Sequence, residues 1–334
     1  EETGMTGANN LGSDMMNGTI LLNLDSEDDG EIFIGCAGGV DTTITFDYKR
    51  EMAPTGCHWF RIELSNLSGG HSGGDIHEGR ANSNKLLARF LFNLSLNHTL
   101  KLSEISGGNL RNAIPRAAHA IFGVSAESKE KVMVAFNEYV AAVEKEYTHT
   151  DPNMTITIES VEKPEYAIDT DTSDRLIKSL YACPHGVISM SHDLEGLVET
   201  STNLAAVKMQ DNSTILVTTS QRSSVESRKW DIARQVEALF LLAGAHVTHG
   251  DGYPGWAPDM NSTIMKIASD AYEGLYNVKP AIKAIHAGLE CGLFLTKYPH
   301  LDMVSFGPTL RGVHSPSEKM YIPAVEKFWN QLTL

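Results

Sequence analysis

Apolar and polar residues alternate in two stretches of the first quarter of the chain. Residues 43–48 (Thr-Ile-Thr-Phe-Asp-Tyr) and 57–64 (Cys-His-Trp-Phe-Arg-Ile-Glu-Leu) carry apolar side chains at roughly every second position. This period is typical of strands that bury one face. Apolar runs at 20–24 and 31–36 are also predicted to be strands, joined by an acidic turn. Ala37-Gly38-Gly39 then interrupts the pattern, which places a predicted domain boundary there.

A helical period follows at residues 83–97, where Leu86, Leu87, Phe90, Leu91 and Leu94 share one face. Further helices are predicted over 126–147, 173–181, 226–243, 262–276 and 324–332, and further strands over 119–124, 154–161, 198–209, 215–220, 281–285 and 302–306. The order strand, helix, strand, strand, helix is ferredoxin-like. A second ferredoxin-like unit is predicted to begin with the strand at 154–161.

These patterns predict an α/β protein in three segments. Residues 251–334 return to alternating strands and helices, which indicates a mostly parallel sheet. If this sheet continues residues 1–39, then residues 40–250 form an inserted α+β domain of doubled ferredoxin-like order.

Composition narrows the class of protein. The 334 residues suffice for about two domains. The net charge of −15 argues against a nucleic-acid surface, which needs a basic stripe. No apolar run approaches the ~20 residues of a membrane-spanning helix. Four scattered cysteines without CxxC spacing favour reduced thiols in a cytoplasmic protein. Because the first residue is not Met, the sequence is expected to be a fragment or a processed product.

Carboxylates and one histidine form the first set of candidate site residues. Glu1 and Glu2 are adjacent, and Asp25 follows the apolar run at 20–24. Adjacent acids inside a protein need a cation or a proton, and an acid at the end of such a strand lies where open α/β sheets bind ligands. With His314, they are zinc-type ligands beside a potential general base. Taken singly, each is more typical of a solvated terminus, a turn cap or an ordinary loop histidine.

A second set lies in glycine-rich or polar loops. His71 stands among four glycines at 69–74, which allow close approach of the backbone to a ligand. Arg222 and Glu290 follow predicted strands. Each has an alternative interpretation: a solvated histidine, a surface charge and a carboxylate at a helix start. Because no local zinc motif such as HExxH occurs, spacing alone does not decide whether the protein is an enzyme.

Together, these stretches resemble the M20 metallopeptidases, specifically the aminoacyl-histidine dipeptidases of the PepD type (cytosol non-specific dipeptidases). The resemblance covers essentially the whole chain. It rests on stretches that are weak singly and specific together: Glu1 to Met5, Leu24 to Glu27, Gly35 to Gly39, Gly69 to His77, Arg111 to Arg116, Gly252 to Trp256, His286 to Gly292, Ser305 to Thr309 and His314 to Pro316.

The resemblance implies a catalytic α/β domain (1–39 and 251–334) interrupted by a lid domain (40–250) that can form a homodimer. It implies two divalent metal ions, usually zinc, with Co or Mn as alternatives, and a small peptide substrate. By similarity, Glu1 is the general base, while Glu2, Asp25 and His314 bind metal. His71 contacts the scissile carbonyl, Arg222 the substrate carboxylate and Glu290 the free amino group.

One departure from the family pattern keeps other functions open. In this family, the first metal histidine, the aspartate two residues after it and the bridging aspartate precede the Glu-Glu pair, so all three are absent from this sequence. The ligands that remain are expected to bind metal poorly. The alternatives are a related M20 amidohydrolase, such as a deacylase or tripeptidase, and a non-catalytic dimerising or binding module.

Overall fold

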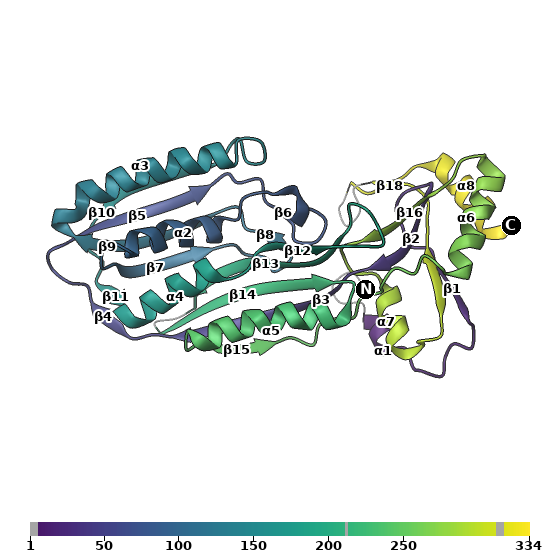
Figure 1. Cartoon of the computed structure of the whole chain (residues 1–334), viewed down its shortest axis with the longest axis horizontal. Helices are drawn as coiled ribbons and strands as arrows, with labels where there is room; N and C mark the ends of the chain where they lie inside the picture. Colours follow the sequence, from purple (N-terminus) through teal and green to yellow (C-terminus); the bar gives the residue numbers. More distant parts are fainter. Residues whose placement is uncertain (1–5, 211–212, 312–316) are drawn as a thin grey trace.

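The computed structural model describes residues 6–210, 213–311 and 317–334. A small sheet lies at one end of an elongated molecule and a large antiparallel sheet at the other (Figure 1). The small sheet has the order β1-β17-β2-β16. Its strands are β1 (Ile20–Asn23), β2 (Glu31–Cys36), β16 (Ala281–Ile285) and β17 (Asp302–Ser305). The predicted α/β fold class is confirmed.

Parallel pairing dominates the small sheet. Strand β1 pairs with β17 and β2 with β16 in parallel, while β17 meets β2 at one antiparallel position. The helices beside it are α1 (Thr6–Asn10), α6 (Thr263–Tyr276), α7 (Glu290–Lys297) and α8 (Ile322–Thr333). Ile32 and Ile34 of β2 pack with Val304 and with Ile264 of α6. The parallel pairing of β1 with β17, from Ile20 opposite Asp302 to Asn23 opposite Ser305, places the carboxyl ends of these two strands side by side.

The large sheet has the order β10-β5-β9-β7-β13-β14-β3-β15, with β12 also paired to β13. Its strands are β3 (Gly38–Asp47), β5 (Cys57–Ser65), β7 (Lys101–Gly107), β9 (Ala118–Ser125), β10 (Thr155–Val161), β12 (Gly186–Met190), β13 (Val198–Met209), β14 (Thr214–Ser223) and β15 (His246–His249). Its helices are α2 (Ser83–Ser95), α3 (Lys129–Glu146), α4 (Thr170–Ala182) and α5 (Glu226–Leu242). Short pairs complete the described strands: β4 (Arg50–Met52) with β11 (Tyr166–Ile168), β6 (Gly70–His71) with β8 (Ala113–Ile114), and β18 (Leu310–Arg311) with β19 (Lys319–Met320).

Two ferredoxin-like units form this sheet, and one is nested inside the other. The inner unit runs β5-α2-β7-β9-α3-β10, and the outer unit runs β3-α4-β13-β14-α5-β15. In both, the first strand lies between the third and the fourth. The prediction that the strand at 154–161 opens the second unit is wrong, because β10 pairs with β5 and closes the first. An alternating pattern identifies a strand but not its partner, since pairing depends on residues far away in sequence.

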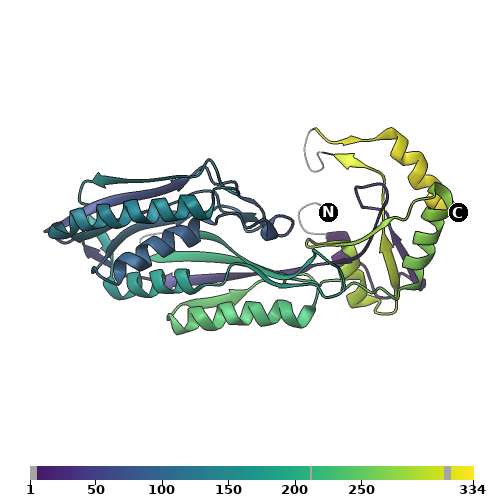
Figure 2. The ribbon, with the colours of Figure 1, turned by 45° about the horizontal axis from the view of Figure 1, so that its top comes forward.

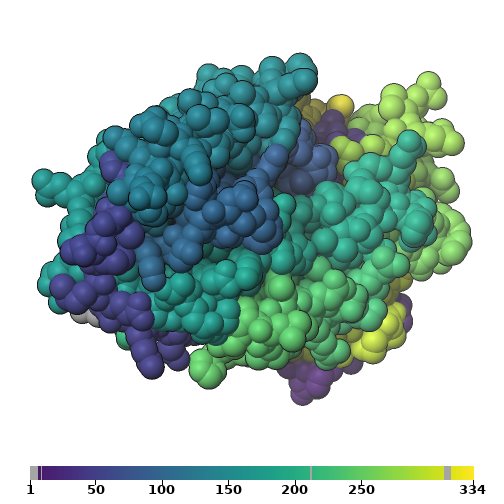
Figure 3. Space-filling view, turned by 60° about the vertical axis from the view of Figure 1, so that its left-hand side comes forward, coloured from purple at the N-terminus to yellow at the C-terminus, as the bar shows by residue number. Residues whose placement is uncertain are grey.

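The two units meet where β7 pairs with β13, at Gly107 opposite Val207 and Ser106 opposite Lys208. Viewed from the far end of the large sheet, they form one continuous surface (Figure 3). Sheet membership changes between Cys36 and Gly38. The predicted division into residues 1–39, 40–250 and 251–334 stays a prediction.

Helices α2 to α5 lie on one face of the large sheet (Figures 1 and 2). That face carries the main hydrophobic core, in which Phe122 stacks on Phe60 at 5.6 Å between ring centroids. The opposite face carries polar residues such as Arg61 and Glu63, which alternate with the core residues of β5. This alternation is expected of an antiparallel sheet with one solvated face. Within the described part of the chain, no helix is both long and apolar enough for a membrane crossing.

Asp169 joins the start of α4 to the segment after β3. Its carboxylate accepts hydrogen bonds from the N–H groups of Thr172 and Lys49, both at 2.9 Å. Burial by itself would raise the pKa of this carboxyl, but these N–H groups outweigh it and hold the pKa below its usual value. A depressed folded-state pKa contributes stability that is present above the unfolded pKa of about 3.9 and is lost as pH falls through the folded pKa.

We therefore expect Asp169→Ala to lower the free energy of unfolding by about 1 kcal/mol near pH 7, the usual cost of losing a helix cap. The loss should shrink as pH falls from about 3.9 through the lower folded-state pKa, because the wild-type carboxyl then becomes protonated as well. Urea denaturation near pH 7 and at the acidic end of this range measures both effects. Asp171→Ala, which removes a mostly exposed carboxylate from the same turn, is the control and should change stability little. Equal destabilisation by Asp169→Ala near pH 7 and in acid would contradict the role of the ionised Asp169 carboxylate as the cap of α4.

Candidate functional site

A loop of the inner ferredoxin-like unit presents His71. Strand β6 ends at this residue and pairs with β8, His71 lying opposite Ala113. The backbone N–H of His71 donates to Asp75 Oδ2 at 2.7 Å, and Ser72 N–H donates to the carbonyl of Asn112 at 2.8 Å. The first bond closes the loop through a side chain of its own, and the second ties it to the neighbouring loop. His71 as a residue is exposed, while its imidazole is partly desolvated by the groups around it.

The hydrogen bonds of the His71 imidazole fix its tautomer. Nδ1 accepts from the N–H groups of Gly73 at 3.2 Å and Gly74 at 3.0 Å. In the neutral ring the proton is therefore on Nε2, which is left as a donor. Burial and then the nearby charge of Arg222 lower the pKa of His71, and Asp75 partly opposes them. The ring stays neutral near pH 7 and can donate one hydrogen bond from Nε2.

Asn112 lies beside His71 on the neighbouring loop. The Asn203 side chain in β13 donates to the carbonyl of Ala113 at 2.8 Å and so braces this loop. Asn112 lines a hollow of about 400 Å³ together with Arg222 and Tyr253. The pattern around Asn112 does not single it out as a site residue, although it falls within the stretch Arg111 to Arg116 that carries the family resemblance.

Arg222 is buried near the end of β14, with 7% of its surface exposed. Its Nη1 donates to Tyr253 Oη at 2.7 Å, while its buried Nε has no hydrogen-bond partner within the described chain. No ion pair of Arg222 occurs among the described residues. A buried cation without a counter-charge is costly, and a guanidinium matches the planar fork of a carboxylate. The arrangement suits an incoming carboxylate.

His286 connects both units of the large sheet to the end of β16. Its Nε2 and Ser201 Oγ lie 2.7 Å apart, and its buried Nδ1 has no hydrogen-bond partner in the described chain. Burial, and then Arg222 and His71, lower its pKa to about 3. A Cβ on Gly73 would stand 2.2 Å from the His286 carbonyl oxygen, so only glycine lets the His71 loop lie this close. The structure thus brings His71, Arg222 and His286 together.

Asp25 and Glu290 lie at the carboxyl end of β1. Asn23 Oδ1 accepts from the backbone N–H of Asp25 at 3.0 Å and from Ser305 Oγ at 2.7 Å. Its Nδ2 donates to Glu290 Oε2 at 3.5 Å, and Glu290 begins α7. Ser305 Oγ is also 2.7 Å from buried Ser26 Oγ. This network places the exposed Asp25 and the Glu290 carboxylate around one strand end.

The described residues do not by themselves form a metal site. Within residues 6–210, 213–311 and 317–334, no three side chains of His, Cys, Asp and Glu converge as metal ligands. Of the predicted ligands, Asp25 is described, while Glu1, Glu2 and His314 lie outside the described residues. Arg311 forms a 2.7 Å ion pair with Asp28, and Leu310 N–H donates to the Glu27 carbonyl. The chain leading toward residue 312 therefore lies beside the Asp25 loop.

Comparisons with known proteins agree with this arrangement. Residues 62–151 match the family described as "Peptidase dimerisation domain". The chain is 42% identical to the cytosol non-specific dipeptidase of Escherichia coli (strain K12), over all of this chain and 68% of that protein. The crystal structure of aminoacylhistidine dipeptidase from Vibrio alginolyticus matches with a TM-score of 0.94 and 44% identity, covering 99% of this chain and 68% of that one.

Proposed function

The chain belongs to the M20 peptidase family, together with the cytosol non-specific dipeptidases, and we propose that it hydrolyses dipeptides with a free amino and a free carboxyl end, including those that end in histidine. The observation that supports this proposal most directly is the buried guanidinium of Arg222, which forms no ion pair among the described residues and lines a hollow together with Asn112. Asp41, which lines the same hollow, is paired with Arg111, and a short substrate with a terminal carboxylate would give Arg222 a partner.

The two ends of the substrate have separate partners in this proposal. Arg222 binds the carboxylate, and Tyr253 holds the guanidinium from the other side through its 2.7 Å hydrogen bond. Glu290 at the end of β1 receives the free amino group. An ion pair at each end admits a peptide of one length, which favours a dipeptidase over an endopeptidase.

His71 acts at the peptide bond itself. Its Nε2–H is the free donor, because Nδ1 is occupied by two N–H groups. In the proposal it donates to the scissile carbonyl oxygen, where negative charge develops during attack. A preorganised donor at that position lowers the barrier more than it strengthens ground-state binding.

The metal-dependent part of the proposal rests on the family. Two divalent ions, zinc by preference, supply an activated water and electrostatic stabilisation when bound. Asp25, with Glu2 and His314, is proposed to contribute ligands from this chain, and Glu1 to take a proton from the attacking water and deliver it to the leaving amine. The described residues alone do not complete such a site.

Assembly and location follow as secondary proposals. The match to a peptidase dimerisation domain over 62–151 supports a homodimer through the lid. The junction between β7 and β13 is already occupied within the chain, so among the described strands the edges β10, β15 and β12 stay available to a second copy. The name of the Escherichia coli relative supports a cytoplasmic location.

Hydrolysis of alanyl-histidine, followed by release of free histidine, tests the function. We expect turnover to stop when a chelator removes divalent metal and to return when Zn²⁺ is added. Carboxyl-amidated and amino-acetylated forms of the same peptide should be poor substrates. Turnover that is indifferent to the chelator would refute the metal-dependent mechanism. Saturable dipeptide binding without turnover in the presence of Zn²⁺ would favour the binding-module alternative.

A further inference from the structure

A buried lysine holds the loop that carries Tyr253. Lys229 belongs to the first turn of α5, and only 2% of its surface is exposed. Its ammonium group donates to the backbone carbonyl of Tyr253 at 2.8 Å and forms an ion pair with Glu226 at 2.9 Å. Burying an ammonium group is costly, and an apolar side chain of similar size is often at least as stable in such a place. Stability alone therefore does not account for a lysine at this position.

The Tyr253 loop, residues 252–256, is anchored on the start of β3. The backbone N–H of Tyr253 donates to the Gly39 carbonyl at 2.8 Å, and the Tyr253 carbonyl accepts from Gly39 N–H at 3.0 Å. A Cβ on Gly39 would be 2.7 Å from Tyr253 Oη, so the phenol lies directly over this glycine. Gly39 is also the residue that pairs with Arg222 of β14, whose Nη1 donates to the phenol. Lys229 is thus linked to the guanidinium of Arg222 through a single residue, Tyr253.

The same loop contacts the helix that begins at Glu290. Gly292 lies in the first turn of α7, and a Cβ on it would be 2.4 Å from the carbonyl oxygen of Pro254. Any larger residue than glycine would therefore push the Tyr253 loop away from α7. The loop thus lies between the two groups proposed to bind the ends of the substrate, Arg222 and Glu290.

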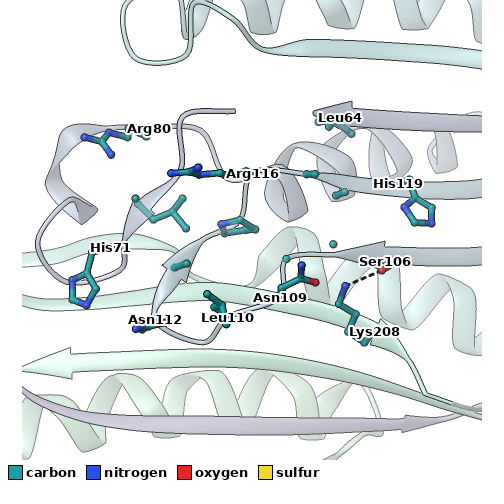
Figure 4. A pocket seen from close by; sticks show the side chains of 18 of the residues that line it. Leu64, His71, Arg80, Ser106, Asn109, Leu110, Asn112, Arg116, His119 and Lys208 are labelled. Carbon is teal, nitrogen blue, oxygen red and sulfur yellow. Dashed lines mark hydrogen bonds between the residues drawn. The ribbon is translucent and has the colours of Figure 1, made fainter. Parts of the chain in front are cut away.

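The position of Arg222 also matters for His71. Asn112 lines the hollow of Arg222 and lies beside His71 at one end of a larger hollow of about 860 Å³ (Figure 4). A peptide anchored at Arg222 is therefore next to the loops of Asn112 and His71. Moving the guanidinium would move the peptide bond relative to His71 Nε2, and small displacements of this kind are costly in rate.

We propose that Lys229 is a positioning residue for dipeptide hydrolysis, which holds Arg222 in place through the Tyr253 loop. This inference rests on the proposed function, because it requires Arg222 to bind the substrate carboxylate. Lys229 itself contacts neither the substrate nor the reacting atoms. Its removal should therefore impair hydrolysis only of those substrates that use Arg222.

Lys229→Met tests the proposal with two substrates, the free acid and the carboxyl amide of alanyl-histidine. The variant is expected to fold, because the Tyr253 carbonyl keeps its bond from Gly39 and the half-exposed Glu226 is open to solvent. Its free energy of unfolding in urea should be no lower than that of wild type. Its kcat/KM for the free acid should fall about tenfold, and that for the amide less than about threefold, because only the free acid depends on where Arg222 lies.

The outcomes separate this inference from the proposed function. A wild-type protein without preference for the free acid would refute the proposed role of Arg222, and this inference with it. A wild-type preference that survives in full in Lys229→Met would refute the role of Lys229 alone. Equal losses for both substrates would also refute it, because they would indicate general damage to the structure.

A double-mutant cycle shows whether Lys229 acts through Tyr253. Tyr253→Phe removes the hydroxyl that accepts from Arg222 and should itself reduce the preference for the free acid. Lys229→Met should then reduce it little further in the Tyr253→Phe background, since changes along one path are not additive. Arg228→Met removes the neighbouring, half-exposed cation of α5 and is the matched control, with the preference of wild type. Additive losses in the cycle, or a lost preference in Arg228→Met, would overturn the assignment.

Discussion

Replacing Arg222 with methionine is expected to lower kcat/KM for an unblocked dipeptide about 100-fold, which corresponds to about 3 kcal/mol. The expected size follows from the loss of a charge-assisted hydrogen bond in a buried setting. Methionine fills similar space without the charge, so the change tests the guanidinium rather than the packing. The measurement compares alanyl-histidine with its carboxyl amide. Wild type should strongly prefer the free carboxylate, and the variant should show little preference.

A second readout of the same variant does not depend on turnover. Arg222 lowers the pKa of His71, so removing the guanidinium should raise that pKa, as followed by NMR titration of the imidazole protons. Arg228→Met, which removes a half-exposed guanidinium paired with Glu199, is the matched control and should leave the His71 pKa unchanged. A preference for the free carboxylate that survives Arg222→Met would refute the proposed role, even if overall activity fell.

Local sequence patterns predicted the individual elements well. The strand at Glu31–Cys36 has the predicted bounds, and the helix predicted over 83–97 spans Ser83–Ser95. Helix α7 is absent from the predicted elements, although a helix start at Glu290 is one of the alternatives for that residue. The helix is short and carries Gly292 near its start, where helix propensity is low. The spacing of apolar residues in a segment indicates which of its side chains are buried, and therefore whether it forms a helix or a strand. This can be read without knowing the rest of the chain.

Arrangement was harder to predict, because it depends on pairing between distant segments. Nothing near residue 154 indicates that β10 pairs with β5 rather than opening the next unit. The same limit applies to Tyr253 and His286. Each belongs to the candidate site because of a hydrogen bond to a residue far away in sequence, Tyr253 to Arg222 and His286 to Ser201. Family resemblance supplied the assignments of Asp25, His71, Arg222 and Glu290, which stay predictions about role. Those for Glu1, Glu2 and His314 fall outside the described residues.

Replacing His71 with alanine is expected to lower kcat about 100- to 1000-fold with little change in KM. The range is typical of the loss of one donor to a developing oxyanion, because such a donor contributes mainly in the transition state. The structure gives the donor atom: Nδ1 accepts from Gly73 and Gly74, so Nε2 carries the proton. Steady-state kinetics with alanyl-histidine separates kcat from KM.

The control for this prediction lies in the same loop. His77 is roughly half exposed and 3.3 Å from Glu78 Oε1, and His77→Ala should keep kcat within a few-fold of wild type. His71→Asn and His71→Gln sharpen the test, because a side-chain amide also has a donor and an acceptor. Partial recovery by either relative to alanine would support hydrogen-bond donation. If His71→Ala instead raised KM and left kcat intact, His71 would bind the ground state, and its assignment to the scissile carbonyl would be wrong.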